Sequence, residues 1–517
     1  MSDFSHVPET PRGWVKTTLG AIRKSYSGSV NPEDHAATQF EHYSVPSFDG
    51  GKPVIEKGSD IGSTKKVVEK DMVLLCKINP RINRAWRVRD YSENQKIGST
   101  EWIRFPRVEG VDPDYLRLYM SQSAFRNYLA LNASGAGGSL MRVNKGVVDK
   151  HPFLVPSLSE QRRIVAKIEE LFTNLDAGQS DLATAEQQLE RYRLSVLQAA
   201  VEGRLTADWR PTHDPEPADQ LLERILEERR KQWEEHYRWS RYDSKGKEPP
   251  SGWKDRYDER ETPKVDDVSI ELPESWTWTS ADQIGRVETG STPKTSVDEY
   301  YGGKYPFYRP GDLEAGLNVT EAEKTLTDKG LKEARPLPEK STLITCIGAT
   351  IGKTGLIRTR GASNQQINAI IPPPSVVPEY VYYVTNSPFF QTLINQRASA
   401  TTMPILNKGR TKTMPFPLPP LAEQKQIVDE VERLLSVADD AAATAEREQT
   451  RAERLRQSIL KQAFSGRLVP HEEDATPPSV DGAASEQSDS DASNGRDSHV
   501  EDLLGSTDPD KQIEMDL

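Results

Sequence analysis

The sequence predicts an α+β protein in which two globular domains of mixed helices and strands are separated by two long helices that pair with each other, with pseudo-two-fold symmetry. The prediction depends on an internal repeat, on a heptad pattern inside it, and on a mixed segment of about 150 residues before each copy. The repeat relates Pro156–Leu205 to Pro419–Leu468 with a constant offset of 263 residues and no gap. Eight of the first 17 aligned positions are identical, and both copies end in Gly-Arg-Leu. Such a pattern indicates a duplicated protein.

Each copy carries apolar residues at alternating steps of three and four, which is the pattern of a coiled-coil helix. Large residues hold the central positions in the first copy, and alanines hold them in the second. Because a bulky seam facing an alanine seam lets two helices pack closely, we interpret the copies as partners of each other. Two independent surface helices, or a coiled coil between two chains, are the alternative. The corresponding positions are Leu175, Leu182 and Leu189, and Ala438, Ala445 and Ala452.

The sequence divides into six predicted segments. Strand-like stretches, turn clusters and short helices precede each long helix, and both mixed regions open alike, with Pro-Arg-Gly-Trp14 and Pro-Glu-Ser-Trp276. The segments are a first mixed domain (1–157), a long helix (158–205), a charged linker with a short helix (206–271), a second mixed domain (272–418), a second long helix (419–468) and a disordered acidic tail (469–517).

The net charge of −12 is concentrated at one end of the chain. Residues 471–517 hold 14 Asp or Glu against Arg496 and Lys511, so the rest of the chain is neutral. This tail has few apolar residues, a composition typical of disorder. Residues 1–155 carry 22 Lys or Arg against 17 Asp or Glu, and residues 272–418 carry 16 against 13. Both globular regions are therefore mildly basic, which permits binding to a polyanion.

Other features of composition indicate a cytoplasmic protein without a membrane span. The chain has 517 residues, 35% of them hydrophobic, and no apolar run approaches 18 residues. Its first residues have neither a basic start nor an apolar core, so no export signal is visible. Cys76 and Cys346 are too few and too scattered for a disulfide framework or a metal site.

The repeated motifs resemble those of the specificity (HsdS-type) subunit of type I restriction–modification enzymes, over residues 11–470. The resemblance is carried by Pro-Ser-Leu-Ser-Glu-Gln-Arg-Arg-Ile164, by Pro-Pro-Leu-Ala-Glu-Gln-Lys-Gln-Ile427 and by the Gly-Arg-Leu ends. The turn from Ile347 to Thr354, followed by Asn-Gln-Gln366, adds to it. The first domain departs from the pattern because it has Lys77–Arg84 where the second has Gly348–Thr354. The two domains are therefore expected to recognise different half-sites.

The resemblance implies that the mixed domains are target-recognition domains and that the long helices pair antiparallel as a coiled coil. Each domain would read one half of a bipartite double-stranded DNA target, and the stiff helices would fix the gap between the halves. Expected partners are two modification subunits, which are adenine methyltransferases, and two restriction subunits, which are nuclease-translocases. S-adenosylmethionine, ATP and Mg²⁺ would belong to these partners, so that this chain needs no cofactor. A modification-only or type IIB-like system and a DNA-indifferent coiled-coil scaffold are the alternatives.

No motif in the sequence predicts catalysis or metal binding by this chain. Gly348-Ala-Thr-Ile-Gly352-Lys-Thr has three residues between its glycines where a phosphate loop needs four, so a strand-to-turn bend is the better interpretation. The segment Gly135–Leu140 lacks the third glycine of a dinucleotide fingerprint. Asn-Pro-Pro-aromatic, HExxH and GxSxG motifs do not occur. The chain is therefore predicted to be a non-catalytic recognition subunit.

Clusters of cations are the predicted DNA contacts. Lysine and arginine neutralise phosphates, arginine also binds guanine in the major groove, and asparagine pairs with adenine. Solvated loop charges are the alternative interpretation. In the first domain the candidates surround Trp86, and in the second they follow the glycine turn or lie near the domain exit. They are Lys77, Asn79, Arg81, Asn83, Arg84, Arg87 and Arg89, and Lys353, Arg358, Arg360, Lys408, Arg410 and Lys412.

The repeated polar residues at the start of each long helix are predicted to dock the modification subunits. A face that only contacts solvent has less reason to repeat Glu-Gln in both copies, although solvated charges or helix caps are the alternative. The candidates are Glu160, Gln161, Arg162, Glu423, Gln424 and Lys425.

Overall fold

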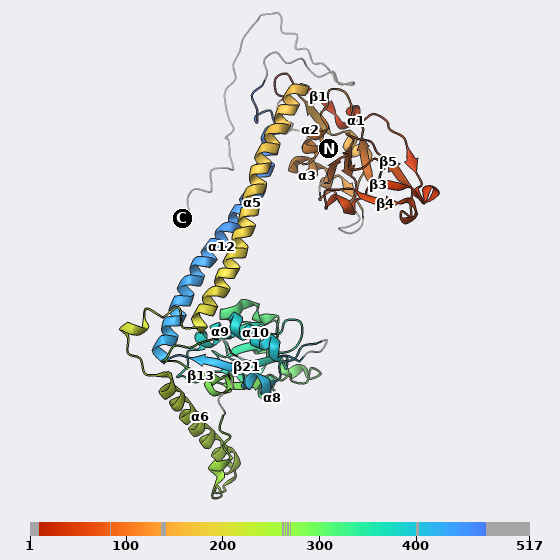
Figure 1. The fold of residues 1–517 in the computed structure, drawn as a ribbon. Helices are drawn as coiled ribbons and strands as arrows, with labels where there is room; N and C mark the ends of the chain where they lie inside the picture. The colour runs from red at the N-terminus through yellow and green to blue at the C-terminus, as the bar shows by residue number, and fades with distance from the viewer. Residues whose placement is uncertain are drawn as a thin grey trace, which may run out of the picture. The chain divides into compact units, whose positions relative to one another are not determined.

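The computed structural model describes residues 10–82, 84–135, 141–260, 263, 265, 268, 270–399 and 403–471. Its chain forms two compact units, one of residues 1–175 with 453–517 and the other of residues 176–452. Each unit contains one globular domain and a segment of both long helices, α5 (Leu158–Val201) and α12 (Leu421–Phe464) (Figure 1). Most of the predicted acidic tail, residues 472–517, lies outside the described residues.

The first domain is built from two main sheets and two short strand pairs. The larger sheet has the order β2 (Ser29–Val30), β5 (Lys65–Val67), β8 (Gln95–Gly98), β3 (Gln39–Tyr43) and β4 (Val54–Lys57). The smaller has the order β7 (Ala85–Arg87), β6 (Val73–Cys76) and β9 (Trp102–Phe105). The pairs are β1 (Val15–Thr18) with β12 (Pro152–Val155) and β10 (Ala133–Ser134) with β11 (Arg142–Val143). The helices are α1 (Leu19–Ile22), α2 (Pro113–Met120), α3 (Ser123–Leu131) and α4 (Lys145–Asp149), with 3-10 turns η1 (Pro32–His35), η2 (Pro46–Phe48) and η3 (Gly58–Asp60).

The second domain repeats this plan with two four-stranded sheets. One has the order β14 (Arg286–Thr289), β21 (Ile367–Ile371), β18 (Thr342–Thr345) and β19 (Thr354–Leu356). The other has the order β16 (Thr325–Leu326), β15 (Tyr301–Tyr308), β20 (Gly361–Ser363) and β17 (Pro336–Leu337), and β13 (Thr277–Ser280) pairs with β22 (Pro415–Leu418). The helices are α7 (Ala281–Ile284), α8 (Asp328–Glu333), α9 (Pro378–Asn386), α10 (Pro388–Arg397) and α11 (Lys408–Lys412), with η7 (Asp298–Tyr300) and η8 (Asp312–Asn318).

Matching contacts show that the duplication extends through both domains. The strand that enters each long helix pairs antiparallel with the first strand of its domain, β12 with β1 and β22 with β13. A buried tyrosine of the first long domain helix then bonds that entering strand. Tyr115 donates to the Leu154 carbonyl at 2.9 Å, and Tyr380 donates to the Pro417 carbonyl at 3.0 Å. The base of each domain is therefore built in the same way.

The long helices run antiparallel in both units. In the first unit the Arg456 guanidinium lies 5.0 Å from the centre of the Phe172 ring. In the second, Gln449 donates to Glu186 at 3.0 Å and Arg193 donates to Asp439 at 2.7 Å, so residue numbers rise along one helix and fall along the other. Two mixed domains with two paired 44-residue helices confirm the predicted fold class.

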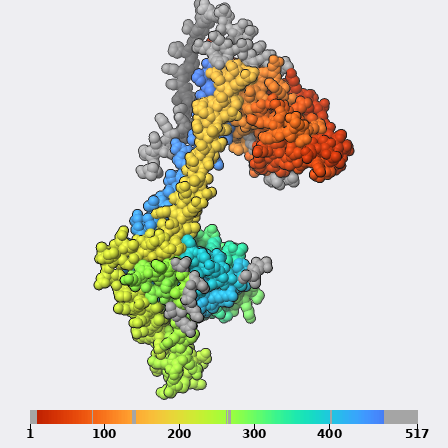
Figure 2. Space-filling model, in the orientation of Figure 1, coloured from red at the N-terminus to blue at the C-terminus, as the bar shows by residue number. Residues whose placement is uncertain are grey.

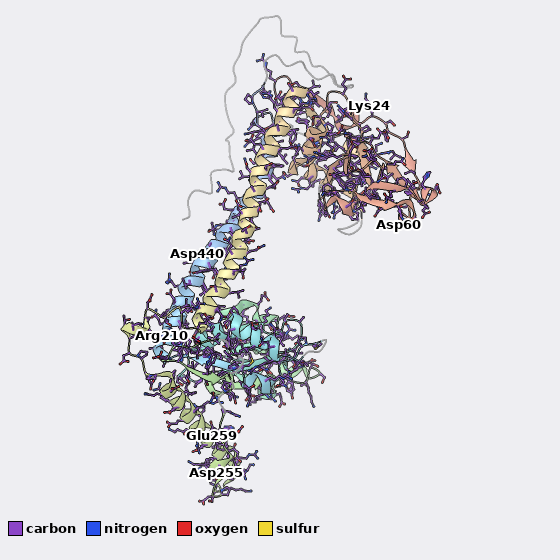
Figure 3. The ribbon with its side chains drawn as sticks, viewed as in Figure 1. Lys24, Asp60, Arg210, Asp255, Glu259 and Asp440 are labelled. Atoms are coloured by element: carbon purple, nitrogen blue, oxygen red, sulfur yellow. The ribbon has the colours of Figure 1, made fainter. Side chains whose placement is uncertain are left out.

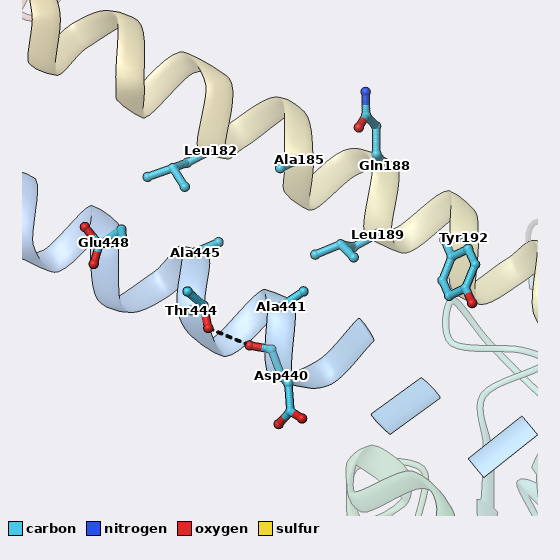
Figure 4. A pocket seen from close by; sticks show the side chains of 10 residues that line it. All are labelled: Leu182, Ala185, Gln188, Leu189, Tyr192, Asp440, Ala441, Thr444, Ala445 and Glu448. Atoms are coloured by element: carbon cyan, nitrogen blue, oxygen red, sulfur yellow. Dashed lines mark hydrogen bonds between the residues drawn. The ribbon is translucent and has the colours of Figure 1, made fainter. Parts of the chain in front are cut away.

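The bulky seam of α5 faces the alanine seam of α12, as predicted. Figure 4 shows Leu182 and Leu189 directed toward the stretch of α12 that carries Ala441 and Ala445. The small alanines leave an open groove of about 610 Å³ between the helices, and Glu448 is among the residues that line it. The size of the side chains along this seam determines how closely the backbones of α5 and α12 approach each other.

A helical linker joins α5 to the second domain within the second unit. It contains η4 (Arg210–Thr212), α6 (Ala218–Arg241), η5 (Asp243–Lys245) and η6 (Trp253–Arg256). Helix α6 and the segment after it project from the domain (Figures 1 and 2). Among the described residues, no helix combines the length and apolarity needed to cross a membrane.

Candidate nucleic-acid interface

The two domains carry equivalent turns between adjacent strands, β6–β7 in the first and β18–β19 in the second. Each turn begins with a residue in the left-handed region, Asn79 at φ 47° and Gly348 at φ 97°. Asparagine and glycine are the residues that adopt this conformation at least cost. Each of these residues bonds a later segment of the chain. The Asn79 N–H donates to the Met141 carbonyl at 2.7 Å, and the Gly348 N–H donates to the Pro404 carbonyl at 3.1 Å.

Further hydrogen bonds close the two turns in the same register. The N–H of Ile82 bonds the Asn79 carbonyl at 2.9 Å, and the N–H of Ile351 bonds the Gly348 carbonyl at 3.1 Å. The equivalent turn residues, Asn79 with Gly348 and Ile82 with Ile351, differ by 269 positions. Arg81 therefore occupies the place of Thr350 in an otherwise shared backbone frame.

A second segment lies against each turn. Arg142 forms an isolated antiparallel bridge with Ile78, and Ile405 forms the same bridge with Ile347. We call these segments, residues 141–143 and 403–406, the straps. Sequence reasoning missed them because each bridge joins residues about 60 positions apart. The only available signal was the repeated Asn-Lys at residues 144–145 and 407–408, which begins the helix after each strap.

In the first domain the candidate cations have different environments. Arg81 is exposed at the tip of the turn and makes no ion pair with a described residue. Lys77 pairs with Glu101 at 3.6 Å, Arg84 with Asp49 at 3.5 Å, and Arg89 with Asp114 at 3.7 Å. Asn79 has its side chain half-buried. Asn83 lies outside the described residues.

Arg87 differs from the other candidates because it is paired with two carboxylates of its own domain. Its Nη2 lies 2.6 Å from Asp71, and its Nη1 contacts Asp114. Burial alone lowers the pKa of Arg87, but the hydrogen bonds and charges of these two carboxylates raise it above its ordinary value. The strand β7 turns this side chain toward the acids of the domain. Trp86 beside it is buried 4.8 Å from Tyr43, so this aromatic residue belongs to the core.

In the second domain the candidate cations fall in two groups. Arg360 is exposed, while Lys353 contacts Glu314 of η8 and Arg358 contacts Glu379 of α9. The second group lies on the short helix α11, which packs against β14 and α7. In that group Lys408 pairs with Glu288 at 2.9 Å, Lys412 pairs with Asp282 at 3.4 Å, and exposed Arg410 donates to the Arg397 carbonyl at 2.9 Å.

The docking prediction is corrected for both glutamates and both glutamines of the repeated signature. Glu160, Gln161, Glu423 and Gln424 are at most 3% exposed, so they present no surface to a partner. Instead, each glutamate accepts a hydrogen bond from the opening tryptophan of its domain. Trp14 Nε1 donates to Glu160 at 3.1 Å, and Trp276 Nε1 donates to Glu423 at 2.9 Å.

The glutamines fix each domain to the start of its long helix. The Gln161 side chain accepts from the Asp112 N–H at 2.7 Å and donates to the Pro156 carbonyl at 2.9 Å. Gln424 makes the same two bonds, with the Val377 N–H at 2.9 Å and the Pro419 carbonyl at 3.0 Å. Both capture backbone groups that would otherwise be unpaired at the start of α2 and α9.

The repeated Gly-Arg-Leu closes the same joint from the other helix. Gly203 at the end of α5 has φ 69°, and Gly466 at the end of α12 has φ 71°. A Cβ at Gly203 would lie 2.6 Å from Pro273, and one at Gly466 would lie 2.8 Å from Pro11. Glycine is therefore required both for the helix ending and for the close approach. Each domain is held by the start of one long helix and the end of the other.

Arg162 and Lys425 are the members of the docking set that remain exposed. They follow the buried Glu-Gln on the outer side of each helix start. No group of three or more His, Cys, Asp or Glu that could hold a metal ion is found in the part of the chain that the structure describes.

Comparisons with known proteins agree with this architecture. Residues 273–446 match the family model of the type I restriction modification DNA specificity domain. The type I restriction enzyme MjaIX specificity subunit of Methanocaldococcus jannaschii is 29% identical over 197 residues, which is 37% of this chain and 44% of the relative. The EcoBI specificity subunit of Escherichia coli is 24% identical over 360 residues, 67% of this chain and 65% of the relative. The chain thus spans less than two thirds of the length of both.

A solved structure supports the fold. The crystal structure of the HsdS subunit from Thermoanaerobacter tengcongensis aligns with a TM-score of 0.52 and 19% sequence identity. The alignment covers 89% of this chain and 98% of that one. Both domains and both long helices therefore have counterparts in one known architecture.

Proposed function

We propose that the chain is the DNA specificity subunit of a type I restriction–modification complex, a proposal supported by the duplicated signature and by the similarity to HsdS-type specificity subunits. Each domain reads one half of a bipartite double-stranded DNA target. The observation that carries this proposal is the pair of equivalent turns, which share a backbone frame and differ in the side chains that they expose. A shared frame places both turns alike on DNA, while different side chains select different bases.

The long helices set the gap between the two half-sites in this proposal. A continuous helix of 44 residues is about 66 Å long and cannot be compressed as a flexible linker can. The joints built from Trp, Glu, Gln and the helix-ending Gly fix each domain on the helices. A fixed joint is what a constant spacing and rotational phase between two DNA contacts require.

The catalytic chemistry belongs to partner subunits in this proposal. Two modification subunits dock near the helix starts, where Arg162 and Lys425 are exposed, and two restriction subunits join the complex for cleavage. S-adenosylmethionine, ATP and Mg²⁺ serve those subunits. This chain positions them on DNA without catalysing methyl transfer or cleavage itself.

A genome-wide map of methylated adenine tests the proposal. Cells with the chain and its partner subunits are expected to methylate a bipartite sequence that stays unmethylated when the chain is deleted. If deletion leaves every methylated sequence in place, the chain is a scaffold indifferent to DNA. Methylation without restriction of incoming unmodified DNA assigns it to a modification-only system.

Arg81 provides the sharper test of the first domain. Substitution Arg81→Ala removes an exposed cation at the tip of the turn, and the assembled complex is expected to bind target DNA about 10-fold more weakly, in line with the loss of one base or phosphate contact. Lys16→Ala, which removes an exposed lysine from strand β1, is the matched control. Equal affinity of the Arg81→Ala complex and the wild type at moderate salt would show that this turn does not contact DNA.

A further inference from the structure

The projection formed by α6 and the segment after it, residues 218–260, has no equivalent among the described elements of the first unit. The other elements near the helix ends match one to one between the two domains. Within the described residues the projection therefore belongs to the second domain, and the repeated joint does not explain it.

Both ends of the projection are fixed on the same short helix, α7. Ala218, Leu221 and Ile225 of α6 are buried in the core of the second domain, beside α7. Farther along α6, Arg229 donates to the Gln283 carbonyl at 3.1 Å. The returning segment ends with Arg260, which pairs with Asp282 at 2.7 Å. The projection is thus a closed hairpin, anchored where it leaves the domain and where it returns.

Aromatic rings make the outer half of this hairpin a defined structure. The ring of Tyr237 lies 4.7 Å from Trp233 on the same helix, and 6.1 Å from Trp253 on the returning segment, with parallel planes. Tyr257 packs 5.3 Å from Trp233. These contacts hold the returning segment against α6. Figure 3 places Asp255 and Glu259 on this returning segment, with Asp255 farther from the second domain than Glu259.

Charge is divided along the hairpin. Residues 218–235, next to the domain, carry four Lys or Arg and six Asp or Glu, whereas residues 236–257 carry six Lys or Arg and three Asp or Glu. Arg241, Lys245 and Lys247 are exposed and make no ion pair with a described residue. Trp239, between the cations of the helix end, is 63% exposed. The outer half is therefore a basic surface, which we call the basic tip.

We propose that the basic tip binds the sugar–phosphate backbone of DNA that flanks the half-site read by the second domain. This inference rests on the proposed function, because a target-bound subunit always has continuous DNA beside it. Flexible lysines contact phosphates without reading bases, so the contact is independent of sequence. From Ile225, the last buried residue of α6, to Arg241 the helix rises about 24 Å, which is the length of about seven base pairs. The projection is therefore long enough to contact DNA outside the half-site that the second domain reads.

The test measures binding of the assembled complex of the full chain and its modification subunits to duplexes with different flanks. Each duplex carries the target established by the methylation map, with a flank of about 3 or about 25 base pairs beyond the half-site of the second domain. The wild type is expected to bind the long-flank duplex more tightly at low salt. The triple variant R241E/K245E/K247E is expected to lose about 10-fold in affinity for the long-flank duplex, to show a shallower salt dependence, and to bind the short-flank duplex as the wild type does.

A charge-conserving variant, R241K/K245R/K247R, is the matched control and is expected to keep the affinity for the long flank. If charge reversal leaves binding of the long-flank duplex unchanged, the inference is overturned. It is also overturned if reversal weakens both duplexes equally, or if its effect disappears when residues 472–517 are removed, because the acidic tail would then be the occupant. Absence of any sequence-specific methylation by the wild type would refute the proposed function itself, whereas intact methylation with no flank effect refutes only this inference.

Discussion

The joints at the bases of the two domains bury the same carboxylate but neutralise it differently. In the second unit Glu423 accepts from Arg210 at 2.7 Å and from Thr206 at 2.6 Å, in addition to Trp276. Figure 3 places Arg210 in the linker, just after α5. In the first unit the ring of His471 takes the place of this arginine, with its Nδ1 at 2.8 Å from Glu160.

The difference shows which parts of a duplicated joint are constrained. The tryptophan and the carboxylate are the same in both copies, because together they fix the domain on its helix. A buried carboxylate also needs compensation, but any neighbouring cation can supply it. Arginine is always charged, whereas histidine is charged only when it is protonated. The buried carboxylate of the second joint therefore always has a positive charge beside it, whereas that of the first joint has a histidine.

Removing the carboxylate from each joint is expected to have the largest effect. Glu423→Ala leaves the guanidinium of Arg210 and the indole N–H of Trp276 without their acceptor, and the second unit should lose about 3 kcal/mol of stability. Glu160→Ala should cost the first unit less, because His471 is 37% exposed at its side chain and can turn to water. Hydrogen exchange of residues 273–290 and 11–22, followed by mass spectrometry, measures each unit separately.

The conservative variants Glu423→Gln and Glu160→Gln separate charge from shape. Glutamine retains an acceptor for the tryptophan but cannot neutralise Arg210. Glu423→Gln should therefore remain destabilising, while Glu160→Gln should cost less, because the ring of His471 is 37% exposed at its side chain and can bond to water. Equal losses in both units for both substitutions would contradict the proposed difference between the joints.

A second difference lies where each domain approaches its long helix. His151 and Met414 occupy equivalent positions, since the N–H of His151 bonds the Val148 carbonyl at 3.1 Å and that of Met414 bonds the Thr411 carbonyl at 3.2 Å. Burial lowers the pKa of His151 to about 4. Its ring packs 4.8 Å from Phe125 and has no nearby carboxylate to offset that burial.

This histidine should make the first unit sensitive to acid. An imidazole with a lowered pKa in the folded state takes up protons more readily when unfolded, so stability is complete above about pH 6.5 and falls as the pH drops toward 4. At pH 5.5 the loss is about 1 kcal/mol. Pulse proteolysis in urea at pH 7.5 and 5.5 measures it, and His151→Met should remove it. A first unit equally stable at both pH values would show that His151 is not buried as described.

Sequence patterns predicted the helices well and their surroundings poorly. The heptad seams of α5 and α12 are local, so the helices and their pairing followed from the sequence alone. The repeated Glu-Gln was recognised as significant but was assigned to the surface, because a helical pattern does not reveal which face another domain covers. The partner of Glu160 is Trp14, 146 residues away. The informative signal was that the tryptophans recur at an offset of 262 and the glutamates at 263.

The exposed turn was predictable from the sequence, but the environment of each cation in it was not. The run of cations from Lys77 to Arg89 does mark an exposed turn. Strand alternation then turns Arg87 toward Asp71 and Asp114, which no count of charges along the chain could show. The straps were missed for the same physical reason, because each strap contacts its turn through residues that are far apart in the sequence.

The two turns provide the smallest expected difference. Both begin in the left-handed region, but Gly348 has φ 97° and Asn79 has φ 47°, which is nearer to the range that asparagine adopts. No atom of the described residues lies within 4 Å of a Cβ built at Gly348, so Gly348→Ala should cost only the backbone strain, about 1 kcal/mol. Asn79→Gly should change the free energy of unfolding of its domain by only a few tenths of this value of about 1 kcal/mol. Urea unfolding of the second unit, read by pulse proteolysis, measures the first value. A loss of several kcal/mol for Gly348→Ala would mean that the turn is packed against other atoms, and the common frame of the two turns would then not hold.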